Sequence, residues 1–365
     1  MVARYVRNYQ ALRMSGTAED RARIPASHAM TEFEVLDRRG TRERGGFRHR
    51  ADVTHVREYF WAGSIGRGDI LDYTAELVQI LDDSSNFVLN SFQPLLADAD
   101  PTPLWELDRQ TILGELDTDL PQQWIYLATS HYLSEAALQM RAVSSLIRME
   151  VVHYSLPALV RAIVERVGVV CWILDAPGSW ELRFRRAGLT GAVSNFRYAN
   201  LYRGSDPSAY ERLKNQRREI RDLLERRFAV QSGPGVETTY IGDPDAWKVC
   251  GDIYPTFRNL AVEAFKSPDI DPSMAKYVYD FLAVHSHPTI HAGLKFVEVL
   301  ASGSQYRVDY DDVDRVTRFA LVALLNGVRC WDGYFRENPP LRISARESIF
   351  DRFDLLSKSI QDPSE

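Results

Sequence analysis

The segment 157–174 constrains the fold of this chain more than any other. It contains only three charged side chains, and almost all its other residues are apolar. On a helical wheel at about 100° per residue, one set of apolar side chains falls within roughly 80°: Leu159, Ile163, Val167, Val170 and Leu174. Because most of the remaining positions are also apolar, we predict a helix that is buried nearly all round. Such a helix needs other elements on every side.

Helical periodicity continues through most of the chain. Apolar residues repeat at three- and four-residue steps from Ile70 onward, which is typical of amphipathic helices. We predict further helices at about 104–116, 129–152, 206–227, 246–265, 272–286, 289–300, 311–335 and 344–358. Only 238–241 and 306–310 resemble strands. The sequence therefore predicts an all-α fold, an irregular multi-helix bundle with at most minor strands.

Breaker residues and charge suggest a division into three parts. Residues 1–57 are rich in arginine and sustain no apolar period, so we predict a basic, poorly ordered N-terminal arm. The glycine–proline loop near 233 separates an N-terminal half of a helical body, 58–230, from a C-terminal half, 231–365. The two halves could equally form one continuous domain.

The net charge of −6 is unevenly distributed. Residues 1–57 carry +5 and residues 183–227 carry +7, whereas the block 58–182 between them carries −12. Basic segments bind phosphate backbones and acidic surfaces. The two segments therefore suggest RNA or an acidic protein as a partner, and docking onto the acidic block of the same chain is the alternative.

Cysteine usage and hydropathy bear on the compartment. The three cysteines are far apart, which argues against a disulfide framework and for a reducing environment. Cys171 lies in an apolar run and is interpreted as a small core residue. No apolar segment reaches the ~20 residues needed to span a bilayer, and no signal peptide is evident. We predict a soluble, cytoplasmic protein without a membrane partner; a homodimer remains open.

Several nucleotide and hydrolase motifs are missing from the sequence. It contains no P-loop, no G-x-G-x-x-G, no G-x-S-x-G and no H-E-x-x-H. Nothing in it therefore supports a nucleotide-binding α/β enzyme.

Three histidines gather where one predicted helix ends and the next begins: His285, His287 and His291. Pro288 disfavours helix at the residue before it, so the junction falls there. Neutral imidazoles bind zinc or iron well. Three interpretations stay open: helix-capping histidines, acid–base groups of a polar pocket, or ligands of a divalent metal. No cofactor is predicted beyond that metal.

Arg161 and Glu165 stand four residues apart on the apolar helix and can form an ion pair. The pair is either a structural contact on a narrow stripe or part of a polar pocket inside the bundle. In the second interpretation the pair faces the histidine junction. The pocket would then comprise Arg161, Glu165, Tyr279, His285 and His287.

Arg148 and His153 form an R-x4-His pattern. In helical ribonucleases a cation and an imidazole at this spacing act on the scissile phosphate and the 2′-hydroxyl. Glu150 and His153 also match E-x-x-H, a di-iron motif. A di-iron bundle requires a second copy of that motif, which the sequence does not contain.

The order of these motifs resembles a family of uncharacterised helical bacterial proteins. The resemblance rests on the R-x-x-x-E helix around Arg161, the Tyr-x-x-Leu segment 279–282 and the His-Pro step at 287–288, and covers roughly residues 130–335. That family is similar in helical layout to the HEPN superfamily, which includes RNA-cleaving toxins and defence effectors. The resemblance implies a factor acting on RNA in defence or stress, with Arg148 and His153 as catalytic residues.

Two other classes of function stay open from the sequence. The chain could be a non-catalytic interaction or scaffold protein that uses its basic segments. It could also be a metal-dependent enzyme acting on a small molecule through His285, His287 and His291. Whether the protein is an enzyme at all is not decided by these patterns.

Overall fold

The computed structural model describes residues 67–91, 103–116, 120–149, 155–175, 179–232, 247–266, 272–286, 297–300, 303–306, 310–335 and 340–361. The chain divides into two units, Met1–His55 and Val56–Glu365, and all described residues belong to the second. The predicted basic arm 1–57 lies outside the described residues.

Helices dominate the described part, which confirms the all-α prediction. They are α3 (Arg67–Ser91), α4 (Pro103–Leu116), α5 (Leu120–Arg148), α6 (Ser155–Leu174), α7 (Trp180–Tyr202), α8 (Pro207–Glu225), α9 (Phe257–Ala264), α10 (Pro272–Ser286), α12 (Tyr310–Phe335) and α13 (Pro340–Gln361).

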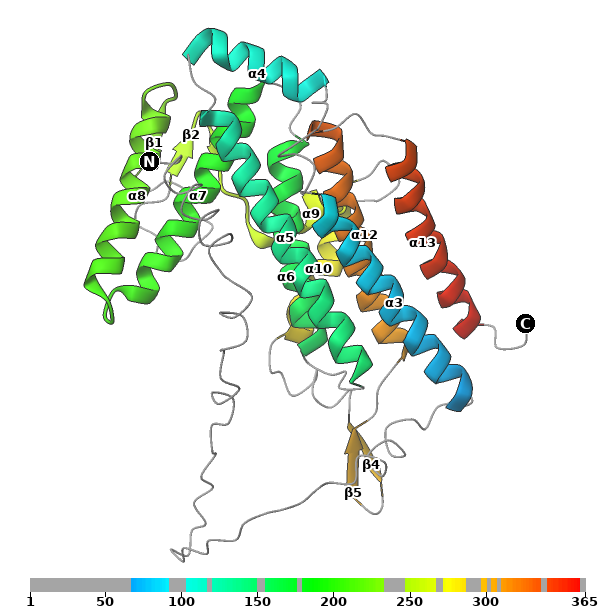
Figure 1. The fold of residues 1–365 in the computed structure, drawn as a ribbon. Coiled ribbons are helices and arrows are strands. Elements are labelled where there is room, and N and C mark those ends of the chain that lie inside the picture. The colour runs from blue at the N-terminus through cyan, green and yellow to red at the C-terminus, as the bar shows by residue number, and fades with distance from the viewer. Residues whose placement is uncertain are drawn as a thin grey trace, which may run out of the picture. The chain divides into compact units, whose positions relative to one another are not determined.

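Helix α6 is the buried helix that its composition predicts. It packs against α5, α7, α9, α10 and α12, and thirteen of its twenty residues are buried. Figure 1 shows α6 directly behind α5. Gly168 explains how closely α9 approaches it, because a Cβ at this position would lie 2.1 Å from the carbonyl oxygen of Leu260. Apolar burial on several sides makes α6 the helix around which the others assemble.

Two further groups of helices complete the packing. Helix α3 packs against α5 and α13, and α7 packs against α8. At the C-terminal end of α12, aromatic rings from α4 and α5 close around Trp331, Tyr334 and Phe335. These three α12 side chains are at most 1% exposed. These three side chains are therefore part of the core.

A small antiparallel sheet interrupts the helices where a single helix at 246–265 was predicted. Strands β1 (Val230–Ser232), β2 (Trp247–Val249) and β3 (Asp252–Ile253) pair in that order, and α9 starts only at Phe257. Cys250 and Gly251 both have positive φ, 47° and 91°, as a two-residue hairpin turn requires. The alternation of apolar and charged residues in Trp247-Lys248-Val249 is the sequence signal that favoured a strand, and it matches the alternating burial of β2.

The helix predicted at 289–300 is also wrong at its end. Residues Val297–Leu300 form strand β4, which pairs antiparallel with β5 (Gly303–Tyr306). The segment Val297-Glu298-Val299 alternates apolar and charged side chains, and its two β-branched valines favour strand over helix. The predicted strand 306–310 overlaps β5 only at its first residue, and 238–241 lies outside the described residues.

In the part of the chain that the structure describes, every helix is too short or too polar to cross a membrane.

Candidate functional site

Arg148 is the last residue of α5 and its side chain is 59% exposed. Its Nη2 lies 2.6 Å from Oδ2 of Asp82 on α3. Helix α6 begins at Ser155, so a short connection carries the chain from Arg148 to the next helix. Glu150 and His153 fall in this connection, outside the described residues. The structure therefore shows an exposed, oriented guanidinium beside the segment that holds the second predicted catalytic residue.

A matched arginine lies two helical turns earlier on the same face of α5. Nη2 of Arg141 donates a hydrogen bond to the side-chain oxygen of Asn86 on α3, over 2.6 Å. Arg141 and Arg148 thus both bridge α5 to α3, one to a neutral amide and one to a carboxylate. Only Arg148 stands at the helix end, so Arg141 provides an internal control for the role of Arg148.

The predicted pairing of Arg161 with Glu165 is confirmed, and Tyr279 joins the two. Nε of Arg161 donates to Oε1 of Glu165 over 2.8 Å, and Nη2 donates to the hydroxyl of Tyr279 over 2.9 Å. The guanidinium also lies over the Tyr279 ring, 5.1 Å from its centroid. The side chains of the ion pair are about one-fifth exposed. Helices α6 and α10 are therefore joined by a half-buried polar contact.

The surroundings of this contact raise the pKa values of both Arg161 and Tyr279. Burial opposes the charge of Arg161, but the hydrogen bond and negative charge of Glu165 outweigh it and raise the pKa of the guanidinium. Burial also raises the pKa of Tyr279, and the charge of Glu165 adds to the effect. The phenol therefore keeps its proton at neutral pH.

Three further polar residues lie close to this contact, and sequence reasoning did not find them. They are Tyr132 on α5, Arg197 on α7 and Tyr254 before α9. The guanidinium of Arg197 lies 5.9 Å from the ring centroid of Tyr254. Burial raises the pKa of both tyrosines, and the charge of Arg197 opposes this. The negative charge of Glu165 also raises the pKa of Tyr254. The same carboxylate therefore raises the pKa of two tyrosines, Tyr254 and Tyr279.

His285 has other neighbours. Its Nδ1 donates to the carbonyl oxygen of Phe281, 2.7 Å away on the same helix, and its ring stacks on the Phe281 ring at 4.2 Å. Phe281 in turn faces Arg315 and Phe319 of α12. Tyr279 contacts α6 instead. The structure thus brings Arg161, Glu165 and Tyr279 together and places His285 in contacts with its own helix.

The metal hypothesis gains nothing from the described residues. Among them, no three His, Cys, Asp or Glu side chains are grouped as a metal site requires. His287 and His291, two of the three proposed ligands, lie outside the described residues.

A second arginine–carboxylate–tyrosine contact lies deep in the core and was also missed. Nη1 of Arg183 on α7 donates to Oδ2 of Asp108 on α4 over 3.0 Å, and the hydroxyl of Tyr334 on α12 donates to the same oxygen over 2.8 Å. The side chains of the ion pair are 3% and 7% exposed. Burial raises the pKa of Asp108, although Tyr334 and Arg183 oppose the shift.

Many of the arginines in the basic segment 183–227 make contacts within the protein. They bond to carboxylates or backbone, or stack on aromatic rings: Arg183, Arg185, Arg186, Arg197, Arg217 and Arg227. The other six basic residues are nearly balanced by the five acidic residues of the segment. Docking onto its own chain thus accounts for much of the charge of this segment. Binding of RNA or an acidic partner there stays a prediction.

Helix α10 carries an apolar stripe on its outer face. Met274, Tyr277 and Val284 are each more than half exposed and fall on one side of the helix at 100° per residue, whereas Phe281 beside them is partly buried against α12. The rings of Tyr277 and Phe281 lie 6.4 Å apart. Exposed apolar surface of this kind is compatible with the interaction hypothesis, which stays a prediction.

Comparisons with protein-family models, with curated proteins and with solved structures find no match to this chain.

Proposed function

We propose that the protein cleaves RNA without a metal, with Arg148 and His153 as the reacting pair. The observation that carries the proposal is the geometry of Arg148: a solvent-exposed guanidinium at the end of α5, held at 2.6 Å by Asp82, five residues before His153. The resemblance to HEPN-like proteins in motif and helical layout adds support.

The chemistry needs two roles that these residues can fill. The imidazole of His153 takes the proton of a ribose 2′-hydroxyl, whose oxygen then attacks the adjacent phosphorus. The phosphorus–O5′ bond breaks and the departing O5′ takes the proton that His153 removed, leaving a 2′,3′-cyclic phosphate and a 5′-hydroxyl. Arg148 stabilises the negative charge that develops on the phosphate oxygens. A guanidinium has five N–H donors, so the ion pair with Asp82 leaves donors for the phosphate.

The test is cleavage of single-stranded RNA by the purified full-length chain in excess chelator. We expect 5′-hydroxyl and cyclic-phosphate products, and no cleavage of the same sequence made as DNA, because the 2′-hydroxyl is the nucleophile. His153→Ala and Arg148→Gln should each lower the rate at least about 100-fold, as loss of a general base or of charge stabilisation does.

Arg141→Gln is the matched control. It removes an arginine that also joins α5 to α3, through Asn86 rather than Asp82, so it should leave cleavage near the wild-type rate. Equal activity of wild type and His153→Ala, or a loss in Arg141→Gln as large as in Arg148→Gln, would contradict the proposal. So would the absence of cleavage in every preparation.

A further inference from the structure

Two cysteines that are far apart in the sequence meet in the core. Cys171 lies near the C-terminal end of α6 and Cys330 near that of α12, and their sulfur atoms are 3.4 Å apart. Both are free thiols. A disulfide requires an S–S distance of about 2.05 Å, so the sulfurs need to approach by roughly 1.3 Å. Helices α6 and α12 pack against each other, which holds the two thiols side by side.

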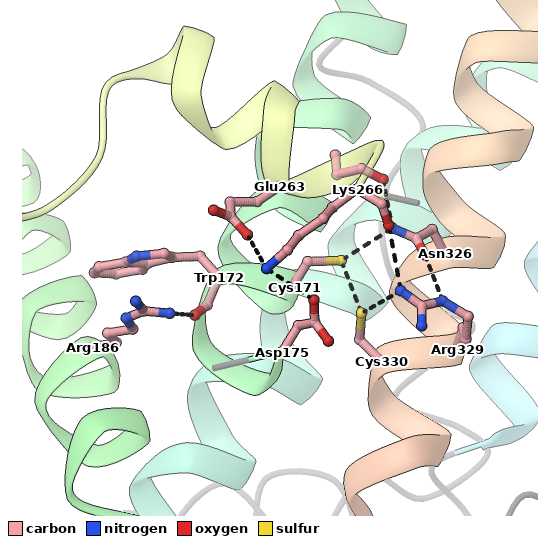
Figure 2. Close-up of polar contacts among 10 residues, drawn as sticks. Cys171, Trp172, Asp175, Arg186, Glu263, Lys266, Asn326, Arg329 and Cys330 are labelled. Carbon is pink, nitrogen blue, oxygen red and sulfur yellow. Dashed lines mark hydrogen bonds and ion pairs between the residues drawn. The ribbon is translucent and has the colours of Figure 1, made fainter. Parts of the chain in front are cut away.

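Figure 2 shows nitrogen donors beside each sulfur. Nη2 of Arg329 lies 3.8 Å from the sulfur of Cys330, and Nδ2 of Asn326 lies 3.8 Å from the sulfur of Cys171. Nε of Arg329 donates to the side-chain oxygen of Asn326 over 2.8 Å, which orients both groups. Reactive cysteines typically lie in electropositive surroundings of this kind.

The same two side chains attach the end of α9 to α12. Asn326 donates to the carbonyl oxygen of Ala264, and Arg329 donates to that of Lys266. The ammonium of Lys266 pairs with Asp175 and Glu263 (Figure 2). The sulfurs are therefore bordered by a polar contact between three helices.

The two thiols are not equivalent. Cys171 is 1% exposed, whereas Cys330 is 8% exposed and stands next to the exposed Arg329. The hydrogen bond with Cys330 and burial raise the pKa of Cys171 well above that of an ordinary thiol. Cys171 thus keeps its proton, and Cys330 is the better placed to react first.

We propose that Cys171 and Cys330 are a redox-responsive pair that closes into a reversible disulfide between α6 and α12 when hydrogen peroxide is present. The sulfur of Cys330 attacks one peroxide oxygen, the O–O bond breaks, and the leaving hydroxide takes the thiol proton to become water. This gives a sulfenic acid at Cys330. The sulfur of Cys171 then attacks the sulfur of Cys330, the S–O bond breaks, and the second hydroxide leaves as water with the proton of Cys171. Two thiols are oxidised by two electrons and one peroxide is reduced to two waters.

The proposal does not depend on RNA cleavage. Cys171 is sixteen residues along α6 from Ser155, about 24 Å at 1.5 Å per residue, so the pair stands well away from Arg148. A disulfide could form in a protein without nuclease activity, and the nuclease could act with both thiols reduced. The two hypotheses therefore fail separately.

Cys250 gives the experiment its control, because it is exposed and lies in the turn between β2 and β3. The test uses full-length Cys250→Ser, which keeps the pair as the only cysteines. After treatment with hydrogen peroxide, unfolding and alkylation, we expect a mass lower by two hydrogen atoms, no alkylated thiol, a monomer on a non-reducing gel and full reversal by dithiothreitol. The thermal midpoint should rise by about 5 °C on oxidation, because the bond closes a long loop.

Two further variants separate the pair from its surroundings. Cys330→Ala in the same background should leave Cys171 alkylatable after peroxide, since its partner is missing. Arg329→Gln should slow disulfide formation roughly three- to tenfold without preventing it. Two alkylatable thiols in peroxide-treated Cys250→Ser would overturn the proposal, as would a bond that forms only between molecules, or an overoxidised Cys330 beside a free Cys171.

Discussion

In the described part of this protein, an arginine, a carboxylate and a tyrosine meet in two different environments. In the core, Arg183 pairs with Asp108 and lies over the ring of Tyr334, 4.9 Å from its centroid. Nearer the surface, Arg161 pairs with Glu165 and lies over Tyr279 at 5.1 Å. The distances are nearly equal, but the side chains of the core ion pair are at most 7% exposed and those of the other pair about one-fifth.

The role of the tyrosine also differs between the two contacts. The hydroxyl of Tyr334 donates a hydrogen bond to Asp108, so the buried carboxylate accepts two hydrogen bonds. Tyr279 accepts a hydrogen bond from Arg161 and also shares one with Glu165, so its hydroxyl contacts both members of the ion pair. Burial makes each lost partner in the core costly, whereas water can replace a lost partner near the surface. The comparison teaches that geometry alone does not set the energetic weight of such a contact.

The largest expected difference follows from removing the two arginines. Arg183→Met leaves Asp108 buried without its cation, and we expect it to lower the free energy of unfolding by about 3–5 kcal/mol. Arg161→Met leaves Glu165 partly exposed to water, and about 1–2 kcal/mol is expected. Urea unfolding of both variants measures the difference. Equal losses would show that exposure does not separate the two contacts.

Removing the hydroxyls should give smaller effects in the same order. Tyr334→Phe takes one donor from a buried carboxylate, at a cost of about 1–2 kcal/mol. Tyr279→Phe leaves Arg161 its bond to Glu165 and costs about 0.5–1 kcal/mol. The same urea titration applies. A larger loss for Tyr279→Phe would contradict the ranking of the two contacts by burial.

How far these contacts were predictable depends on their separation in sequence. Arg161 and Glu165 are four residues apart on a predicted helix, and helical geometry alone brings them together. The buried helix α6 was predictable for a similar reason, because its apolar residues are contiguous in the sequence. Tyr279 entered the predicted pocket through its motif, and the structure places it 2.9 Å from Arg161.

Asp108 and Tyr334 could not be found in that way. They are 226 residues apart, and Arg183 is 75 residues from Asp108. Their meeting depends on how α4, α7 and α12 pack, which no local pattern encodes. The Cys171–Cys330 contact spans 159 residues and was hidden for the same reason. The two hairpins found in place of predicted helices are a different case, because their signal is local. Their strands are so short that period-two alternation is hard to distinguish from helical periodicity.

The smallest expected effect is the pH dependence of stability that the burial of Asp108 causes. A carboxyl with a higher pKa in the folded than in the unfolded state binds more protons when folded, so its contribution to stability falls as pH rises between the two values. Burial raises the pKa of Asp108. Wild type should therefore gain stability relative to Asp108→Asn as pH falls from neutral toward the ordinary aspartate value of about 3.9.

Asp206 provides the opposite case for the same titration. It caps the exposed N-terminus of α8, and hydrogen bonds from the backbone of Ala209 and the side chain of Ser208 lower its pKa. Its contribution is present above about 3.9 and is lost as pH falls through the lowered value, so wild type should lose stability relative to Asp206→Asn there. Urea unfolding from pH 3 to 7 measures both differences. If the two stability differences changed in the same direction with pH, the raised pKa that we assign to buried Asp108 would be wrong.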